Sequence, residues 1–115
     1  MSFDFANLGL TAVMMGRPGQ GRQQLGQAIR LSREIGAPLN ELKARLVLGR
    51  LDLQQGKVAA AATQFERGRR LALSLGLRNW LWRYLLWSAR LKRRRGDATG
   101  ARAALREALR IVEHQ

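Results

Sequence analysis

The side chains that most often carry catalysis are scarce in this chain. It has no cysteine and a single histidine, His114, next to the C-terminus, which excludes cysteine nucleophiles, thiolate zinc sites and histidine clusters. The acidic residues are spread from Asp4 to Glu113, with no pair placed for general acid–base work in a shared pocket. We therefore expect a protein that is not an enzyme, with no catalytic residue, no metal and no cofactor.

Basic side chains, most of them arginine, are the chemically distinctive feature of the sequence. The 21 Lys+Arg residues outweigh 8 Asp+Glu residues and give a formal net charge of +13. Guanidinium groups bind carboxylates and phosphates through paired N–H donors, which favours acidic peptides, small anions and nucleic acids as partners. Arginine-rich helix faces are also often only solvated, so the charge alone identifies no partner.

Length and hydropathy limit the class of protein. The 115 residues, 46% of them hydrophobic, fit a single domain over 1–115 or a short repeat array. No apolar stretch approaches the ~18–20 residues of a membrane span. Asp4 stands where a signal peptide would have its basic region. We expect a cytoplasmic protein with no membrane partner.

An internal repeat of 40 residues organises the chain. Glycines recur at this spacing at Gly16, Gly56 and Gly96, and Gly36 and Gly76 form a further pair. Three other columns hold similar residues throughout: Leu25/Phe65/Leu105, Ala28/Gly68/Ala108 and Arg30/Arg70/Arg110. Self-similarity at a fixed period indicates a repeat architecture. We predict three copies, at about residues 1–38, 39–78 and 79–115.

Apolar spacing within each copy is helical. In the second copy, small and apolar residues occur at positions i, i+4, i+7, i+11 and i+14, which lie on one face of a helix. They are Ala61, Phe65, Gly68, Ala72 and Leu75. First helices are predicted at about 3–15, 40–55 and 79–95, and the recurring glycines suit left-handed residues that end helices. The predicted fold is all-α, with six antiparallel helices in three stacked pairs, because one pair cannot bury both of its apolar faces.

The pattern resembles tetratricopeptide repeats. The segments LGLTAVMMG (8–16), LGRLDLQQG (48–56) and SARLKRRRG (88–96) have the spacing of that family's first helix, and the small–large–small series Ala61/Phe65/Gly68 matches its second helix. The chain departs from the family at its tryptophan and tyrosine sites, which are Arg45 and Asp52 in the second copy, and in a repeat longer than the common ~34 residues. The resemblance implies a right-handed solenoid with a concave face lined by the first helices.

The longer repeat is similar to the helical segment of MalT-type transcriptional activators of the LuxR family. Residues 44–76 (ARLVLGRLDLQQGKVAAAATQFERGRRLALSLG) and 87–112 (WSARLKRRRGDATGARAALREALRIV) carry this similarity. In that family the repeats sense a signal between a nucleotide-binding switch domain and a helix-turn-helix. No GxxxxGK[ST] phosphate loop occurs here. The resemblance implies the non-catalytic sensor or scaffold part of a transcriptional regulator, excised or free-standing.

Two sets of basic residues are candidate binding sites. From the repeat register we predict that apolar and basic side chains of the first helices face the concave groove. These residues are Lys43, Leu46, Arg50, Arg83, Leu86, Arg90, Arg93 and Arg94. Such a groove suits an acidic peptide, a protein or a small anionic ligand. The alternative function is nucleic-acid binding through a convex row formed by Arg30, Arg70 and Arg110. A solvated helix face remains the plain interpretation of either set.

Aromatic residues crowd the first helix of the third copy. Trp80, Trp82, Tyr84 and Trp87 lie there within two turns. Indole rings stack on bases, sugars or partner side chains, but filling of the core between the second and third copies is the favoured interpretation. The register places Trp80 at the start of its helix, where we expect it to be the least buried of the three tryptophans.

The last predicted helix, at about 98–113, has an apolar flank with no repeat after it. This flank consists of Leu109, Ile111 and Val112. Terminal repeats normally carry a polar outer face. Either the native chain continues, or two copies meet here in a symmetric homodimer, which makes a homodimerisation scaffold the third functional alternative.

Overall fold

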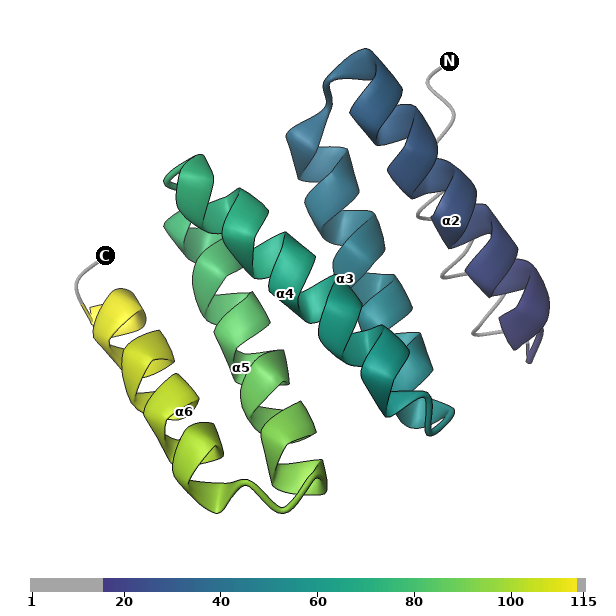
Figure 1. The fold of residues 1–115 in the computed structure, drawn as a ribbon. Helices are drawn as coiled ribbons and strands as arrows, with labels where there is room; N and C mark the ends of the chain where they lie inside the picture. The colour runs from purple at the N-terminus through teal and green to yellow at the C-terminus, as the bar shows by residue number, and fades with distance from the viewer. Residues whose placement is uncertain (1–15, 114–115) are drawn as a thin grey trace.

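The computed structural model describes residues 16–113. This part of the chain forms α-helices and no strand: α2 (Pro18–Ile35), α3 (Pro38–Gln54), α4 (Val58–Ser74), α5 (Arg78–Arg94) and α6 (Ala98–Glu113) (Figure 1). The all-α prediction is confirmed for these residues, whereas the helix predicted at about 3–15 lies outside them. None of the described helices combines the length and apolar character needed to cross a membrane.

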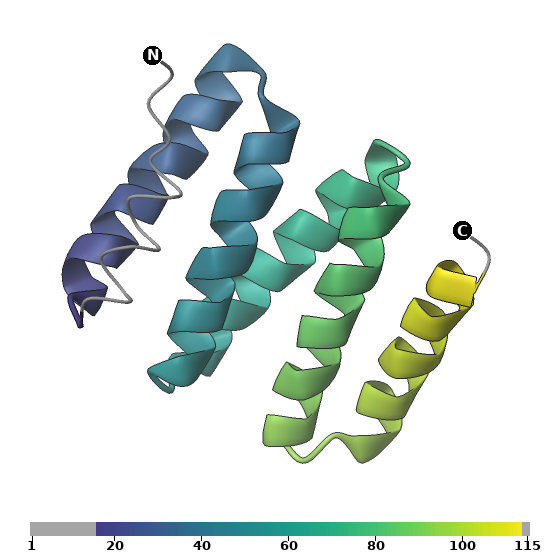
Figure 2. The ribbon, with the colours of Figure 1, turned by 180° about the vertical axis from the view of Figure 1, so that it is seen from behind.

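Consecutive helices pack against each other throughout the described chain. Each of α2 to α5 contacts the next helix in sequence, and α3 also contacts α5. In Figure 1 α4 crosses in front of α3 and α5, and the reverse view in Figure 2 shows α3 and α5 in front of α4. The helices α3 and α5 therefore share one face of the molecule, and α4 lies on the opposite face.

The four turns between the helices are built alike around a glycine with positive φ. The φ angles are 67°, 79°, 66° and 81° at Gly36, Gly56, Gly76 and Gly96. In each turn the N–H of the residue after the glycine donates to the carbonyl oxygen five residues earlier, at 2.8–2.9 Å. This is the Schellman arrangement, which needs a left-handed residue at the glycine position. The predicted left-handed glycines are confirmed, including Gly16 with φ 77°.

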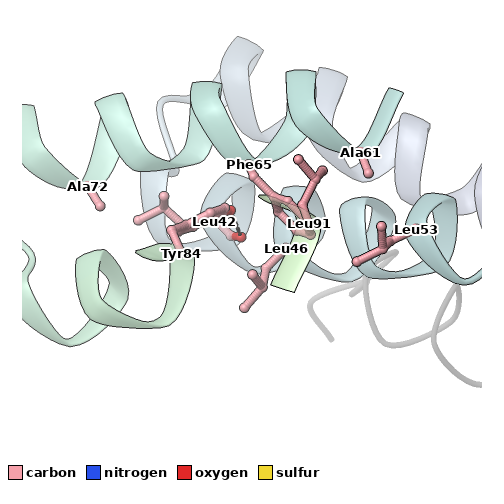
Figure 3. Close-up of a cluster of buried hydrophobic side chains, with 8 residues drawn as sticks. All are labelled: Leu42, Leu46, Leu53, Ala61, Phe65, Ala72, Tyr84 and Leu91. Carbon is pink, nitrogen blue, oxygen red and sulfur yellow. Dashed lines mark hydrogen bonds between the residues drawn. The ribbon is translucent and has the colours of Figure 1, made fainter. Parts of the chain in front are cut away.

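The largest group of buried side chains lies where α3, α4 and α5 meet (Figure 3). We call it the main core, and it consists of Leu42, Leu46, Leu53, Ala61, Phe65, Ala72, Tyr84 and Leu91. Smaller clusters join α2 to α3 and α5 to α6. The predicted buried face of α4 is confirmed except at Leu75, which is 46% exposed because it lies beyond the end of that helix.

Two glycines inside helices allow aromatic rings to approach the backbone closely. A Cβ at Gly49 would lie 2.5 Å from Cε1 of Phe65, and a Cβ at Gly68 would lie 2.0 Å from Cζ of Tyr84. The hydroxyl of Tyr84 donates a hydrogen bond to the carbonyl oxygen of Leu42 at 2.5 Å. The Tyr84 side chain, which comes from α5, therefore passes against α4 and ends on α3, joining three helices.

Burial raises the pKa of the Tyr84 phenol well above its ordinary value. In the unfolded chain the tyrosine phenol ionises near pH ~10. Tyr84 therefore contributes stability that is complete below that pH and is lost as the pH rises above it.

Tyr84 is the only tyrosine, so the absorbance of tyrosinate reports the ionisation of this residue alone. We expect this absorbance to appear only together with loss of helical circular dichroism. In the Tyr84→Phe variant the unfolding free energy should be lower by about 1 kcal/mol, and it should no longer depend on the ionisation of this residue at alkaline pH. Tyrosinate absorbance in a fully helical protein near pH ~10 would contradict the prediction.

Candidate anion-binding face

Arginine and tryptophan alternate on the face that α3 and α5 share. The guanidinium carbons of Arg50 on α3 and Arg90 on α5 lie 4.6 and 4.4 Å from the ring centroid of Trp87. Arg83 lies 5.2 Å from the ring centroid of Trp80. These distances are typical of cation–π contacts. We call these five residues the arginine–tryptophan face.

The spacing along α5 explains why these side chains meet. Trp80, Arg83, Trp87 and Arg90 follow one another at intervals of three, four and three residues, which places them on one side of a helix. Arg50 reaches the same side because α3 contacts α5. The set therefore combines residues from the second and third copies of the repeat, and its geometry depends on how those copies pack.

The tryptophans are shared between the core and the surface. All three are half-buried, and Trp80 and Trp87 pack against the main core. The ring of Trp87 stacks on Phe65, with centroids 6.3 Å apart and planes inclined by 30°. One part of the Trp80 and Trp87 rings thus fills the core, and the guanidinium groups lie against these rings. The indoles hold the arginines beside a rigid apolar support.

The three arginines of this face keep their hydrogen-bond donors available. Arg50, Arg83 and Arg90 are exposed, and none of them pairs with an acidic group within residues 16–113. Their N–H groups can therefore meet a ligand carboxylate or phosphate without first breaking an internal ion pair.

The other residues predicted for the groove have different surroundings. Leu46 is only 8% exposed and belongs to the main core, so it is not an open apolar floor; α3 turns this position toward α4 and α5. Leu86 is half-buried, and so is Lys43, which already has an interaction partner. Arg93 is exposed, while Arg94 donates a hydrogen bond from Nη1 to the carbonyl oxygen of Leu53.

The predicted convex row is dispersed over three helices. Arg30, Arg70 and Arg110 lie on α2, α4 and α6, and all are exposed. Nε of Arg70 donates to Oε1 of Glu66 at 3.0 Å. Glu66 also receives a bidentate pair from Arg69, whose hydrogen bond is the main reason that the pKa of the Glu66 carboxyl is lowered. One of the three row arginines is therefore already paired.

Buried charges on α3 are the structural feature that the sequence analysis missed. Asp52 is 1% exposed and accepts a hydrogen bond from Arg22 of α2. Arg45 is 3% exposed and donates to Glu41 at 2.8 Å and to Gln64 of α4 at 2.9 Å. The available signal was that both occupy the aromatic sites of the tetratricopeptide pattern, where a charge needs a partner. They connect helices and are not exposed to a ligand.

Within residues 16–113, no three His, Cys, Asp or Glu side chains are grouped so that they could hold a metal ion. The chain matches no protein-family model, no curated protein and no solved structure.

Proposed function

We propose that the protein is a non-catalytic binding module that takes an acidic peptide, or an acidic segment of a protein, on the arginine–tryptophan face. The observation that carries this proposal is the position of Trp87, with the guanidinium groups of Arg50 and Arg90 both within 4.6 Å of its ring centroid. Guanidinium groups supported in this way bind carboxylates through directed pairs of N–H donors. The indole adds apolar contact area at low entropic cost.

The architecture proposed for this module is a right-handed, tetratricopeptide-like solenoid in which α3 and α5 line the concave side. Its support is the 40-residue register of the sequence, the like-built turns and the contact between α3 and α5. With the resemblance to MalT-type activators, this favours the sensor or scaffold part of a cytoplasmic transcriptional regulator. Its ligand would then bias the regulator through the packing of successive helix pairs.

A titration with a fluorescently labelled oligoglutamate peptide, followed by anisotropy, tests the proposed site. Arg50→Glu and Arg90→Glu should each weaken binding at least about tenfold, equivalent to about 1.4 kcal/mol. The matched controls Arg30→Glu and Arg110→Glu make the same charge change away from the face, and they should alter the affinity by less than about threefold, under about 0.7 kcal/mol. Equal losses in both sets would show that only the net charge matters and would contradict the proposed site.

Nucleic-acid binding is the second candidate, favoured by the exposure of Arg30 and Arg110. A labelled single-stranded oligonucleotide in the same assay separates the two functions. A nucleic-acid module would bind it more tightly than the peptide, with a logarithmic salt dependence of about 0.7 per phosphate contacted. Loss of that binding in Arg30→Glu and Arg110→Glu, with Arg50→Glu unaffected, would replace our proposal.

A homodimerisation scaffold is the remaining alternative. Leu109 of α6 is 59% exposed and Val112 is 46% exposed, so an apolar flank does lie open on this helix. Light scattering over a range of protein concentrations measures its effect. A mass that doubles with concentration, and stays monomeric in Leu109→Glu, would assign α6 to a dimer interface.

A further inference from the structure

A hollow region lies away from the arginine–tryptophan face, between α4 and α6. The backbones of these two helices do not approach each other closely, and each helix packs on α5. The space above α5 holds two adjoining cavities of about 300 and 180 Å³. Both are lined by Glu66, Ser88 and Lys92, and the larger also by Arg69 and Glu107. We call this space the α4–α6 cleft.

The preceding copy of the repeat shows how such a position is otherwise filled. Forty residues before Lys92 and Leu85 stand Asp52 and Arg45. Asp52 is bound by Arg22 of α2, and Arg45 is bound by Gln64 of α4. The equivalent space above α3 is therefore spanned by polar contacts from both neighbouring helices, and its buried charges are neutralised internally.

No such contacts span the α4–α6 cleft. Lys92 and Ser88 are half-buried, and within residues 16–113 neither the ammonium group nor the hydroxyl has a hydrogen-bond or ion-pair partner. On the α6 wall, Glu107 likewise accepts no hydrogen bond from the described residues; its carboxylate helps Glu66 raise the pKa of Arg69. Glu66 is itself occupied by Arg69 and Arg70.

The groups without a hydrogen-bond partner among the described residues are thus one half-buried cation with a hydroxyl on the floor and one exposed carboxylate on the wall. Leu85, Ala103 and Ala104 supply apolar surface between them. A cavity of about 300 Å³ is at the lower end of the range for small-molecule sites, which suits a metabolite smaller than a nucleotide.

We propose that the α4–α6 cleft binds a small zwitterion of amino-acid size. Its carboxylate would lie at the Lys92 ammonium and the Ser88 hydroxyl, and its ammonium group at the Glu107 carboxylate. The ligand carboxylate would partner Lys92 as Arg22 partners Asp52 at the equivalent position on α3. This site is separate from the proposed peptide site, because its lining residues come from the other side of α5, from α4 and from α6.

Nuclear magnetic resonance titration of the labelled full chain with the proteinogenic L-amino acids, one at a time, tests the proposal. We expect at least one to shift the amide signals around Ser88, Lys92 and Glu107 in a saturable way. The des-amino and decarboxylated analogues of that amino acid should each bind at least about tenfold more weakly, because each leaves one charge of the cleft unmatched. If no amino acid shifts these signals, or if the des-amino analogue binds equally well, the proposal is wrong.

Variants of the cleft locate the binding. Lys92→Met and Glu107→Gln should each reduce the affinity for the best amino acid at least about tenfold. Lys57→Met and Glu113→Gln make the same changes outside the cleft and should leave the affinity unchanged, as should Arg50→Glu, which acts on the peptide site. Thermal denaturation without ligand provides the remaining check. If Lys92→Met and Glu107→Gln couple strongly in a double-mutant cycle, the two side chains pair with each other in solution, the cleft is closed and the proposal fails.

Discussion

Substituting Gly68 with alanine is expected to destabilise the protein by about 3 kcal/mol. A new Cβ would lie 2.0 Å from Cζ and 2.4 Å from the hydroxyl oxygen of Tyr84. The ring has no room to withdraw, because Tyr84 is fully buried and its hydroxyl is bonded to the carbonyl oxygen of Leu42. Relief therefore requires α4 and α5 to separate, which opens the main core. Helix propensity alone predicts the opposite sign, a gain of about 1 kcal/mol for glycine to alanine.

Urea denaturation followed by circular dichroism measures this effect, with Gly26→Ala as the matched control. Gly26 also lies inside a helix, but a Cβ there meets no atom within 4 Å, so its substitution should stabilise the protein by about 0.5–1 kcal/mol. In a Tyr84→Leu background the Gly68→Ala change should become neutral or favourable, because the ring is gone. A stabilising Gly68→Ala in the native background would show that α4 and α5 are not packed as described.

The Glu41→Ala variant is expected to lose about 3 kcal/mol of unfolding free energy. Glu41 accepts the Nε hydrogen bond of Arg45 at 2.8 Å, and the Arg45 side chain is almost completely buried. Removal of the Glu41 carboxylate leaves the Arg45 guanidinium buried, with Gln64 as its remaining partner. Desolvation of that charge is then no longer offset. The loss should exceed what is found at exposed ion pairs such as Glu66–Arg70, where we expect less than about 1 kcal/mol.

Replacing both partners together should cost far less than removing Glu41 alone. The double variant Glu41→Leu/Arg45→Leu introduces the residues found forty positions later on α5, Leu81 and Leu85. Hydrophobic side chains of similar volume often substitute for a buried ion pair at little cost, so we expect a change within about 1 kcal/mol. Chemical denaturation of Glu41→Ala and of the double variant compares the two values. If the double variant is the more damaging, the ion pair makes a larger net contribution than its burial and contacts indicate.

Helix boundaries were accessible from the sequence because the signals that set them are local. The helices predicted at about 40–55 and 79–95 are found at Pro38–Gln54 and Arg78–Arg94. Gly56 and Gly96 define these ends by adopting a conformation that other residues rarely adopt, whatever the packing around them. The apolar face of α4 follows from its 3.6-residue spacing in the same way.

The candidate site was accessible only in outline. The repeat register gives the helix on which Arg50 and Arg90 lie, but their convergence on Trp87 depends on rotamers and on the approach of α3 to α5. Leu46 was predicted to face an open groove, and it is buried for a related reason. The helix α3 contacts three other described helices, so most of the surface of α3 is covered and only a narrow side stays open. The pairing of Asp52 with Arg22 spans 30 residues, and no local pattern specifies it.

The packing of each helix mainly on its sequence neighbours has a kinetic consequence. Among the described helices, every contact apart from that between α3 and α5 joins helices adjacent in the chain. Low contact order of this kind favours rapid folding, because little loop-closure entropy opposes each step. Such an array can nucleate at any helix pair and grow by adding the next. The α3–α4–α5 segment, which holds the main core, is therefore the natural starting point, from which order spreads outward to α2 and α6.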